Sequence, residues 1–178
     1  MSRISLYIGM SLDGYIADEN GGVDWMLGDD SEPNHPGTYE TFLSTVDTVI
    51  MERKTYNQIT QVLSPDSWSY PNQTTYVLTG HPLPDQEKIF FRNQSLTSLL
   101  DDLQATSNQH IWLCGCANLV QQAMGADRID VYHISILPLI LGQGVKLFSA
   151  NTKYLLRLER TLAYNGIVDV VYHRRISE

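Results

Sequence analysis

Short apolar, β-branched runs alternate with segments of helical spacing along most of this chain, and this alternation restricts its fold more than any other feature. The runs predict strands at residues 3–9, 47–51, 74–79, 88–92, 110–114 and 129–141. Apolar residues at helical spacing predict helices at residues 38–46, 53–63, 95–106 and 118–125. Strands joined by helices pair in parallel, so we predict an α/β fold with a mixed, mostly parallel sheet and helices on both faces.

The two ends of the chain depart from this alternation. Residues 154–176 read as two strands around Asn165-Gly166, a dipeptide that is typical of tight hairpin turns. We therefore predict a C-terminal antiparallel hairpin at the edge of the sheet. Residues 10–37 are rich in Gly, Asp, Asn and Pro, and they predict a long loop of the functional kind.

Composition restricts the class of protein. The 178 residues predict one domain, spanning 1–178, because neither a repeat nor a linker-like shift of composition divides the chain. The formal charge of −8 argues against nucleic acid as a partner. No apolar stretch approaches the length of a membrane span, and the N-terminal residues do not resemble a signal peptide. We expect a cytoplasmic protein with reduced thiols and no membrane partner.

The segment Cys114-Gly115-Cys116 joins a predicted strand to a predicted helix and allows three interpretations. Two thiolates cannot complete a four-ligand zinc site, and no further ligand pair stands nearby, so we expect no metal. A redox pair is conceivable. The third interpretation is a turn whose backbone N–H groups meet a phosphate at a helix N-terminus.

Five motifs occur in a fixed order along the chain: "MSLDGYIADENGGVDWML", "DTVIMERKTY", "YVLTG", "IWLCGCANLV" and "LPLILGQGVKLF". Together they resemble the dihydrofolate-reductase-like superfamily. The likeness is greatest to stand-alone homologues of the C-terminal reductase domain of the riboflavin-biosynthesis deaminase/reductase. It covers nearly all of the chain. It implies the dihydrofolate-reductase-like three-layer fold and NADPH as the cofactor.

The resemblance also implies which residues meet the cofactor. The basic and hydroxyl side chains after "VIME" would reach its phosphates, and the loop after "IWLC" would lie against its pyrophosphate. The implied cofactor-binding residues are Gly9, Ile16, Arg53, Lys54, Thr55, Thr79, Gly80, Gly115, Cys116, Ala117, Asn118 and Leu119.

A second set of residues is implied on the substrate side: Ser11, Asp13, Trp25, Gly142 and Gly144. Asp13 would position the substrate near the nicotinamide and is the one catalytic candidate. Asp13 could also be a plain turn residue, and Trp25 could plug the loop against the core.

Three positions depart from the family pattern. Glu52 replaces a glycine, so that a carboxylate stands near the expected phosphate path. If it points away from the site, NADPH can still bind. If it points into the site, we expect weaker NADPH binding or neutralisation of Arg53. Cys116 and Ala117 replace two glycines of the phosphate loop. Because Cys116 would lie at a helix N-terminus, we expect a lowered thiol pKa.

The leading functional prediction is an NADPH-dependent reductase. The family's substrate is a ribosylaminopyrimidine phosphate, and we expect hydride transfer to a pyrimidine- or pterin-type small molecule. The deaminase signature is missing, so this chain could carry out only the reduction. Folate reduction is an alternative, since Asp30 stands five residues after Trp25, although in a poor helical context.

A further alternative is a degenerate, non-catalytic nucleotide-binding protein or scaffold, which the departures at Glu52 and Cys116 favour. We also expect a homodimer, from the resemblance and from the apolar run "YHISILPLILG". The five histidines show no partner spacing, and none is a candidate acid or ligand.

Overall fold

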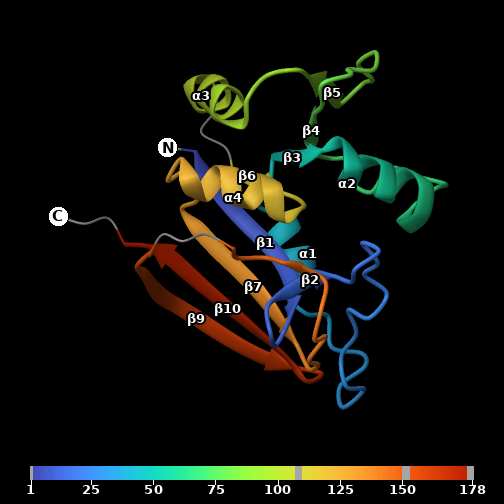
Figure 1. The fold of residues 1–178 in the computed structure, drawn as a ribbon, viewed down its shortest axis with the longest axis vertical. Coiled ribbons are helices and arrows are strands. Elements are labelled where there is room, and N and C mark those ends of the chain that lie inside the picture. Colours follow the sequence, from blue (N-terminus) through green and yellow to red (C-terminus); the bar gives the residue numbers. More distant parts are fainter. Residues whose placement is uncertain (1, 107–109, 150–152, 176–178) are drawn as a thin grey trace. The chain divides into compact units, whose positions relative to one another are not determined.

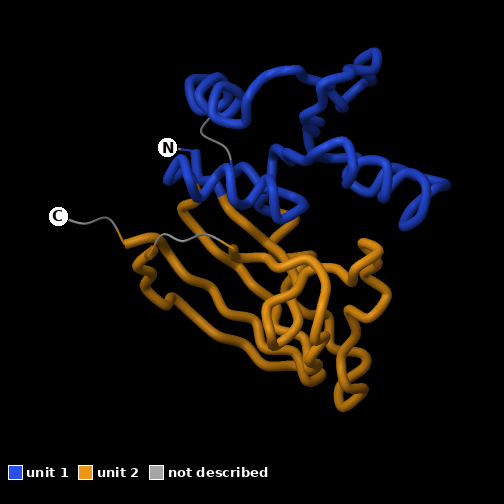
Figure 2. The backbone as a smooth tube through the Cα atoms, viewed as in Figure 1, with its two compact units in different colours: residues 1–4, 45–128 blue, residues 5–44, 129–178 orange. Residues whose placement is uncertain are grey.

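The computed structural model describes residues 2–106, 110–149 and 153–175. The chain divides into two compact units (Figure 2): unit 1 contains residues 1–4 and 45–128, and unit 2 contains residues 5–44 and 129–178. The chain thus leaves unit 2 once and returns to it once.

Unit 1 contains four strands in the order β5–β4–β3–β6 (Figure 1). The strands are β3 (Thr48–Glu52), β4 (Thr74–Leu78), β5 (Ile89–Arg92) and β6 (His110–Leu113). The pairs β3–β4, β3–β6 and β4–β5 are all parallel. Strand β3 is buried from Thr48 to Met51, as expected for a parallel strand that is covered on both faces.

Three helices belong to unit 1. They are α2 (Arg53–Gln58), which continues into the wider π-type turn η1 (Ile59–Leu63), α3 (Leu96–Thr106) and α4 (Ala117–Gly125). Helix α3 buries Leu96, Leu99, Leu100 and Leu103, which form an i, i+3, i+4, i+7 stripe along one face. The Ser95 hydroxyl accepts the Ser98 N–H at 3.2 Å and caps this helix.

The connections place these helices on opposite faces of the strands. The step from β3 to β4 moves toward β5, whereas the step from β5 to β6 returns in the opposite direction. Because parallel crossovers are right-handed, α2 lies on one face and α3 on the other. Helix α4 contacts α3 and shares its face.

An aromatic chain runs through unit 1. Tyr56, Trp68, Tyr70 and Trp112 follow one another with ring centroids 5.3–5.6 Å apart, and Phe91 meets Tyr56 edge-on. Contacts of this kind stabilise a core beyond the area that they bury.

Unit 2 contains most of β1 (Arg3–Ser11) and the strands β7 (Val131–Leu137), β10 (Ile167–Arg174) and β9 (Leu156–Tyr164). Strands β1 and β7 are parallel, while β10 runs antiparallel to both β7 and β9. Asn165 and Gly166 have φ angles of 48° and 73°, which is the geometry of a type I′ turn. The predicted C-terminal hairpin and the mixed, mostly parallel sheet are confirmed.

Two predictions for unit 2 were wrong in detail. Strand β7 ends at Leu137 and does not continue to Leu141, because Pro138 has no N–H to donate to a ladder. Residues 10–37 are not one irregular loop. Strand β1 extends to Ser11, and the short strand β2 (Tyr15–Ala17) pairs with β8 (Val145–Lys146), while α1 (Tyr39–Leu43) follows the loop. Among the described residues, no helix has the length and apolar character to cross a membrane.

Candidate functional site

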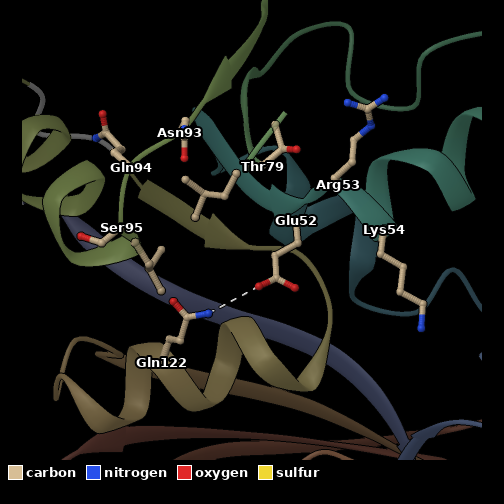
Figure 3. Close-up of a pocket in the computed structure, with 11 residues that line it drawn as sticks. Glu52, Arg53, Lys54, Thr79, Asn93, Gln94, Ser95 and Gln122 are labelled. Atoms are coloured by element: carbon tan, nitrogen blue, oxygen red, sulfur yellow. Dashed lines mark hydrogen bonds between the residues drawn. The ribbon is translucent and has the colours of Figure 1, made fainter. Parts of the chain in front are cut away.

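The carboxyl ends of strands β3, β4 and β5 border a pocket of about 410 Å³ (Figure 3). Open parallel sheets bind ligands at this edge, because the loops that follow the strands meet there. The pocket is lined by Glu52, Arg53, Lys54, Leu78, Thr79, Gly80, Asn93, Gln94, Ser95, Leu96 and Gln122.

Four of the predicted cofactor-binding residues line this pocket. Arg53 and Lys54 begin α2 directly after β3, and Thr79 and Gly80 follow the end of β4. The sequence interpretation missed Asn93, Gln94 and Ser95, although they follow the predicted strand 88–92. The rule that parallel strands end at one edge could have identified them.

Arg53 is held by neutral partners. Its Nε donates to Asn57 Oδ1 at 2.9 Å, and its Nη1 donates to the His81 carbonyl oxygen at 3.4 Å. The guanidinium carbon lies 5.7 Å from the centroid of the Phe91 ring. No carboxylate of the described residues pairs with this side chain, so its charge remains able to attract an anion.

Glu52 points toward α4, and Figure 3 shows its carboxylate directed at Gln122. Its carboxylate accepts hydrogen bonds from Cys116 Sγ at 2.6 Å, Asn118 Nδ2 at 2.5 Å and Gln122 Nε2 at 3.4 Å. It does not neutralise Arg53. A negative charge of the chain itself thus lies beside the helix N-terminus at which a phosphate was predicted.

The predicted lowering of the Cys116 thiol pKa was wrong. Burial, followed by the hydrogen bond to Glu52, raises this pKa to about 11. Burial likewise raises the pKa of Cys114 to about 12. Both thiols are protonated near neutral pH, which makes neither a reactive thiolate. Within residues 2–106, 110–149 and 153–175, no group of three or more His, Cys, Asp or Glu side chains could hold a metal ion.

The loop before α4 brings together further predicted residues. Gly115 has a φ of 150°, and a Cβ atom on it would lie 3.0 Å from the Thr55 hydroxyl. Thr55 on α2 therefore packs against this loop. Ala117 and Leu119 are buried, Leu119 completely, while Asn118 is exposed.

The predicted residues of unit 2 form a separate group around Asp13. Its carboxylate accepts the Ser11 hydroxyl at 2.6 Å and the N–H groups of Leu141 and Gly142 at 3.0 and 2.8 Å. These bonds, the one from Ser11 foremost, lower the pKa of Asp13 to about 2. Asp13 is an ionised anchor for the loop after β7, which suits positioning and not proton donation.

The remaining residues of this group are packed closely. A Cβ atom on Gly144 would lie 2.2 Å from the Ala17 carbonyl oxygen, and one on Gly9 would lie 3.2 Å from Leu137. Ile16 is buried. Trp25 is half-buried and donates from Nε1 to the Gly22 carbonyl oxygen at 3.1 Å, as a loop plug would.

Comparison with known proteins shows the family. The model of the RibD C-terminal domain matches residues 3–172. The protein YwjB of Bacillus subtilis strain 168, which is named as uncharacterized, is 39% identical over 171 residues, covering 95% of this chain and 96% of its own.

Solved structures agree in fold. A protein named for riboflavin biosynthesis from Shewanella sp. PV-4 superposes with a TM-score of 0.83 at 27% identity, over 98% of this chain and 99% of that one. Dihydrofolate reductase from Enterococcus faecalis, complexed with NADP(H) and RAB-propyl, has a TM-score of 0.70 at 17% identity, over 98% of this chain and 97% of its own, which is a likeness of fold alone. This chain has the dihydrofolate-reductase-like fold and belongs to the RibD C-terminal domain family.

Proposed function

We propose that this chain is an NADPH-dependent reductase that acts on a pyrimidine- or pterin-type small molecule. Membership of a reductase-type family supports the reaction class. The observation that carries the proposal for the cofactor is the unit 1 pocket, which gathers Arg53, Lys54 and Thr79 at the carboxyl ends of parallel strands.

The residues of this pocket fit the phosphate-bearing end of NADPH. Two cations and a hydroxyl group can bind the 2′-phosphate, and a volume of about 410 Å³ has the size of a small-molecule site. The turn at Gly115–Asn118 would receive the pyrophosphate with its N–H groups. When bound, the cofactor would supply a hydride, while the protein binds and orients the reactants.

Glu52 opposes the cofactor at one point. Its carboxylate lies beside Cys116 and Asn118, so we infer that a pyrophosphate must displace it from the start of α4. This cost favours one second candidate, a family member that binds a nucleotide weakly and does not catalyse. Folate reduction gains no such support, because Asp30 lies exposed in a loop with a φ of 62° and not on a helix.

Titration with NADPH and NADH tests the proposal. We expect NADPH to bind more tightly than NADH to the wild-type protein. Arg53→Ala should weaken NADPH binding by ~1.5–3 kcal/mol, because a charge-assisted contact to the 2′-phosphate is lost. Lys88→Ala is the matched control, since Lys88 is an exposed cation of unit 1 that lies outside the pocket.

Glu52→Gln separates the two candidate functions. This substitution keeps the size of the side chain and removes its charge, so NADPH should bind about ten-fold more tightly, or roughly 1.4 kcal/mol. Absence of NADPH binding by both the wild-type protein and E52Q would refute the cofactor. Binding without turnover of any pyrimidine or pterin would favour the non-catalytic candidate.

We further propose that the protein is a homodimer. The support is the family resemblance and the exposure of apolar side chains after β7, where Ile140 is 72% and Phe148 is 40% exposed. We also propose a cytoplasmic location. Neither proposal affects the cofactor test.

A further inference from the structure

Unit 2 contains a second recess, distinct from the residues assigned to cofactor or substrate above. It has a volume of about 230 Å³ and lies among β7, β9, β10 and the residue that precedes α1. Its lining combines buried polar groups with apolar ones: Thr38, His133, Arg160, Thr161, Leu162, Asp169 and Val171.

A buried hydrogen-bond network forms the floor of this recess. Asp169 and His133 are 2% and 3% exposed, and His133 Nε2 lies 3.5 Å from Asp169 Oδ2. The same oxygen accepts the hydroxyl groups of Thr38 and, at 3.1 Å, Tyr164. Thr38 Oγ1 also lies 3.2 Å from His133 Nε2 and 3.0 Å from the Tyr7 hydroxyl. His133, for which the sequence shows no partner spacing, meets these partners only in the folded chain.

The second carboxylate oxygen of Asp169 is different. Oδ1 is buried, and it makes no hydrogen bond with any residue that the structure describes. Burial raises the pKa of Asp169, but hydrogen bonding by His133, Ser135 and Thr38 outweighs it, and the pKa lies below its ordinary value. The group is an anion at neutral pH. A buried anion with an unpaired oxygen is costly unless a cation or donor meets it.

The rim of the recess provides the opposite charge. In the β9–β10 ladder Leu162 stands opposite Asp169 and Arg160 stands opposite Val171. Side chains of Asp169 and Val171 share a face, so Arg160 and Asp169 are diagonal neighbours with Cα atoms ~7–8 Å apart. Arg160 is exposed, and none of the ion pairs found among the described residues involves it.

We propose that this recess binds a small zwitterion of the amino-acid type. Because Oδ1 of Asp169 has almost no accessible surface, side chains over the floor must shift for the ammonium group to reach it, while the carboxylate meets the Arg160 guanidinium at the rim. Val171 and Leu162 contact the aliphatic carbon atoms between the two charges. A simple cation would be repelled by Arg160, and a simple anion would be repelled by Asp169.

Titration of the ¹⁵N-labelled protein with glycine, β-alanine and 4-aminobutyrate tests this site, with propylamine and butyrate as singly charged comparisons. We expect at least one of the three zwitterions to shift the amide signals of Thr38 and Asp169, and to bind about ten-fold more tightly than either comparison, a difference of roughly 1.4 kcal/mol. Asp169→Asn should remove the advantage over butyrate, and Arg160→Ala should remove the advantage over propylamine.

A second pair of variants guards against misfolding of D169N. Leu162→Trp should fill the recess from its exposed rim and abolish binding, whereas Leu158→Trp, outside the recess on the same strand, should leave it unchanged. Absence of binding by all three zwitterions, or binding that is unchanged in D169N, R160A and L162W, would overturn the proposal. Both results are independent of NADPH, since the titrations contain no cofactor.

Discussion

Glu52 ends strand β3, and its carboxylate meets the Cys116 thiol 64 positions further along the chain. No local sequence pattern predicts a contact between positions so far apart in the chain. The prediction of a lowered pKa for the Cys116 thiol considered only the helix N-terminus. Burial and the neighbouring carboxylate of Glu52 raise this pKa instead. Asp169 and His133 were missed for the same reason, because they meet only through the register of β7 and β10.

The Glu52–Cys116 contact predicts a change of thiol reactivity. Glu52→Gln removes a negative charge beside the thiol, so the pKa of Cys116 should fall and its thiolate fraction should rise. We expect alkylation by iodoacetamide near pH 8 to be about three-fold faster or more in E52Q. Peptide mass spectrometry measures the rate, and the buried Cys114 serves as the internal control. An equal rate in both proteins would show that Glu52 does not hold the thiol. In either protein, bound NADPH should slow the alkylation of Cys116 by shielding it.

Asp13 gives a prediction about pH. Its folded pKa of about 2 lies below the ordinary value of 3.8, so its contribution to stability is present above pH 3.8 and is lost as pH falls through about 2. Asp13→Asn should remove this part of the acid dependence and speed hydrogen exchange at Leu141 and Gly142. Acid unfolding followed by circular dichroism, together with amide exchange, measures both effects. Unchanged exchange at these two amides would contradict the anchoring role.

At the scale of elements, the two glycines before β8 differ in the space available for a side chain. Gly144 has a φ of 141°, and an added Cβ would meet the Ala17 carbonyl oxygen at 2.2 Å, whereas Gly142 has a φ of 83° and open space. We expect Gly144→Ala to cost about 2–4 kcal/mol of unfolding free energy and Gly142→Ala about 1–2 kcal/mol. Urea denaturation measures both. An equal loss of unfolding free energy in the two variants would show that the backbone between β2 and β8 can shift to accommodate the added methyl group.

The regular elements were predictable where a pattern was long enough. The leucine stripe of α3 and the Asn165-Gly166 turn each place a periodic or conformational constraint on adjacent residues, and both predictions were confirmed. Strands β2 and β8 span three and two residues, which is too short for alternation to be visible. The family resemblance implied Arg53, Lys54, Thr79 and Gly80, and their place in the pocket agrees with the edge that parallel strands share.

At the scale of the whole molecule, the homodimer proposal makes a measurable prediction. Sedimentation at micromolar concentration should give twice the chain mass of 20.1 kDa. Ile140→Asp should shift this to the single chain, because a charge on the exposed apolar segment opposes association. Val62→Asp is the matched control, since Val62 is 70% exposed but belongs to unit 1. A wild-type protein that sediments as a single chain would contradict the proposal.

The aromatic chain of unit 1 allows the unfolding of this unit to be followed separately by fluorescence. The sequence has three tryptophans, of which Trp68 and Trp112 stand in that chain while Trp25 belongs to unit 2. In a Trp25→Phe protein, fluorescence excited selectively in tryptophan would report on unit 1 alone, while far-ultraviolet circular dichroism would report on the whole chain. Coincident unfolding curves from the two signals would show that the two units melt as the single domain expected from the sequence, and separated curves would give each unit a stability of its own.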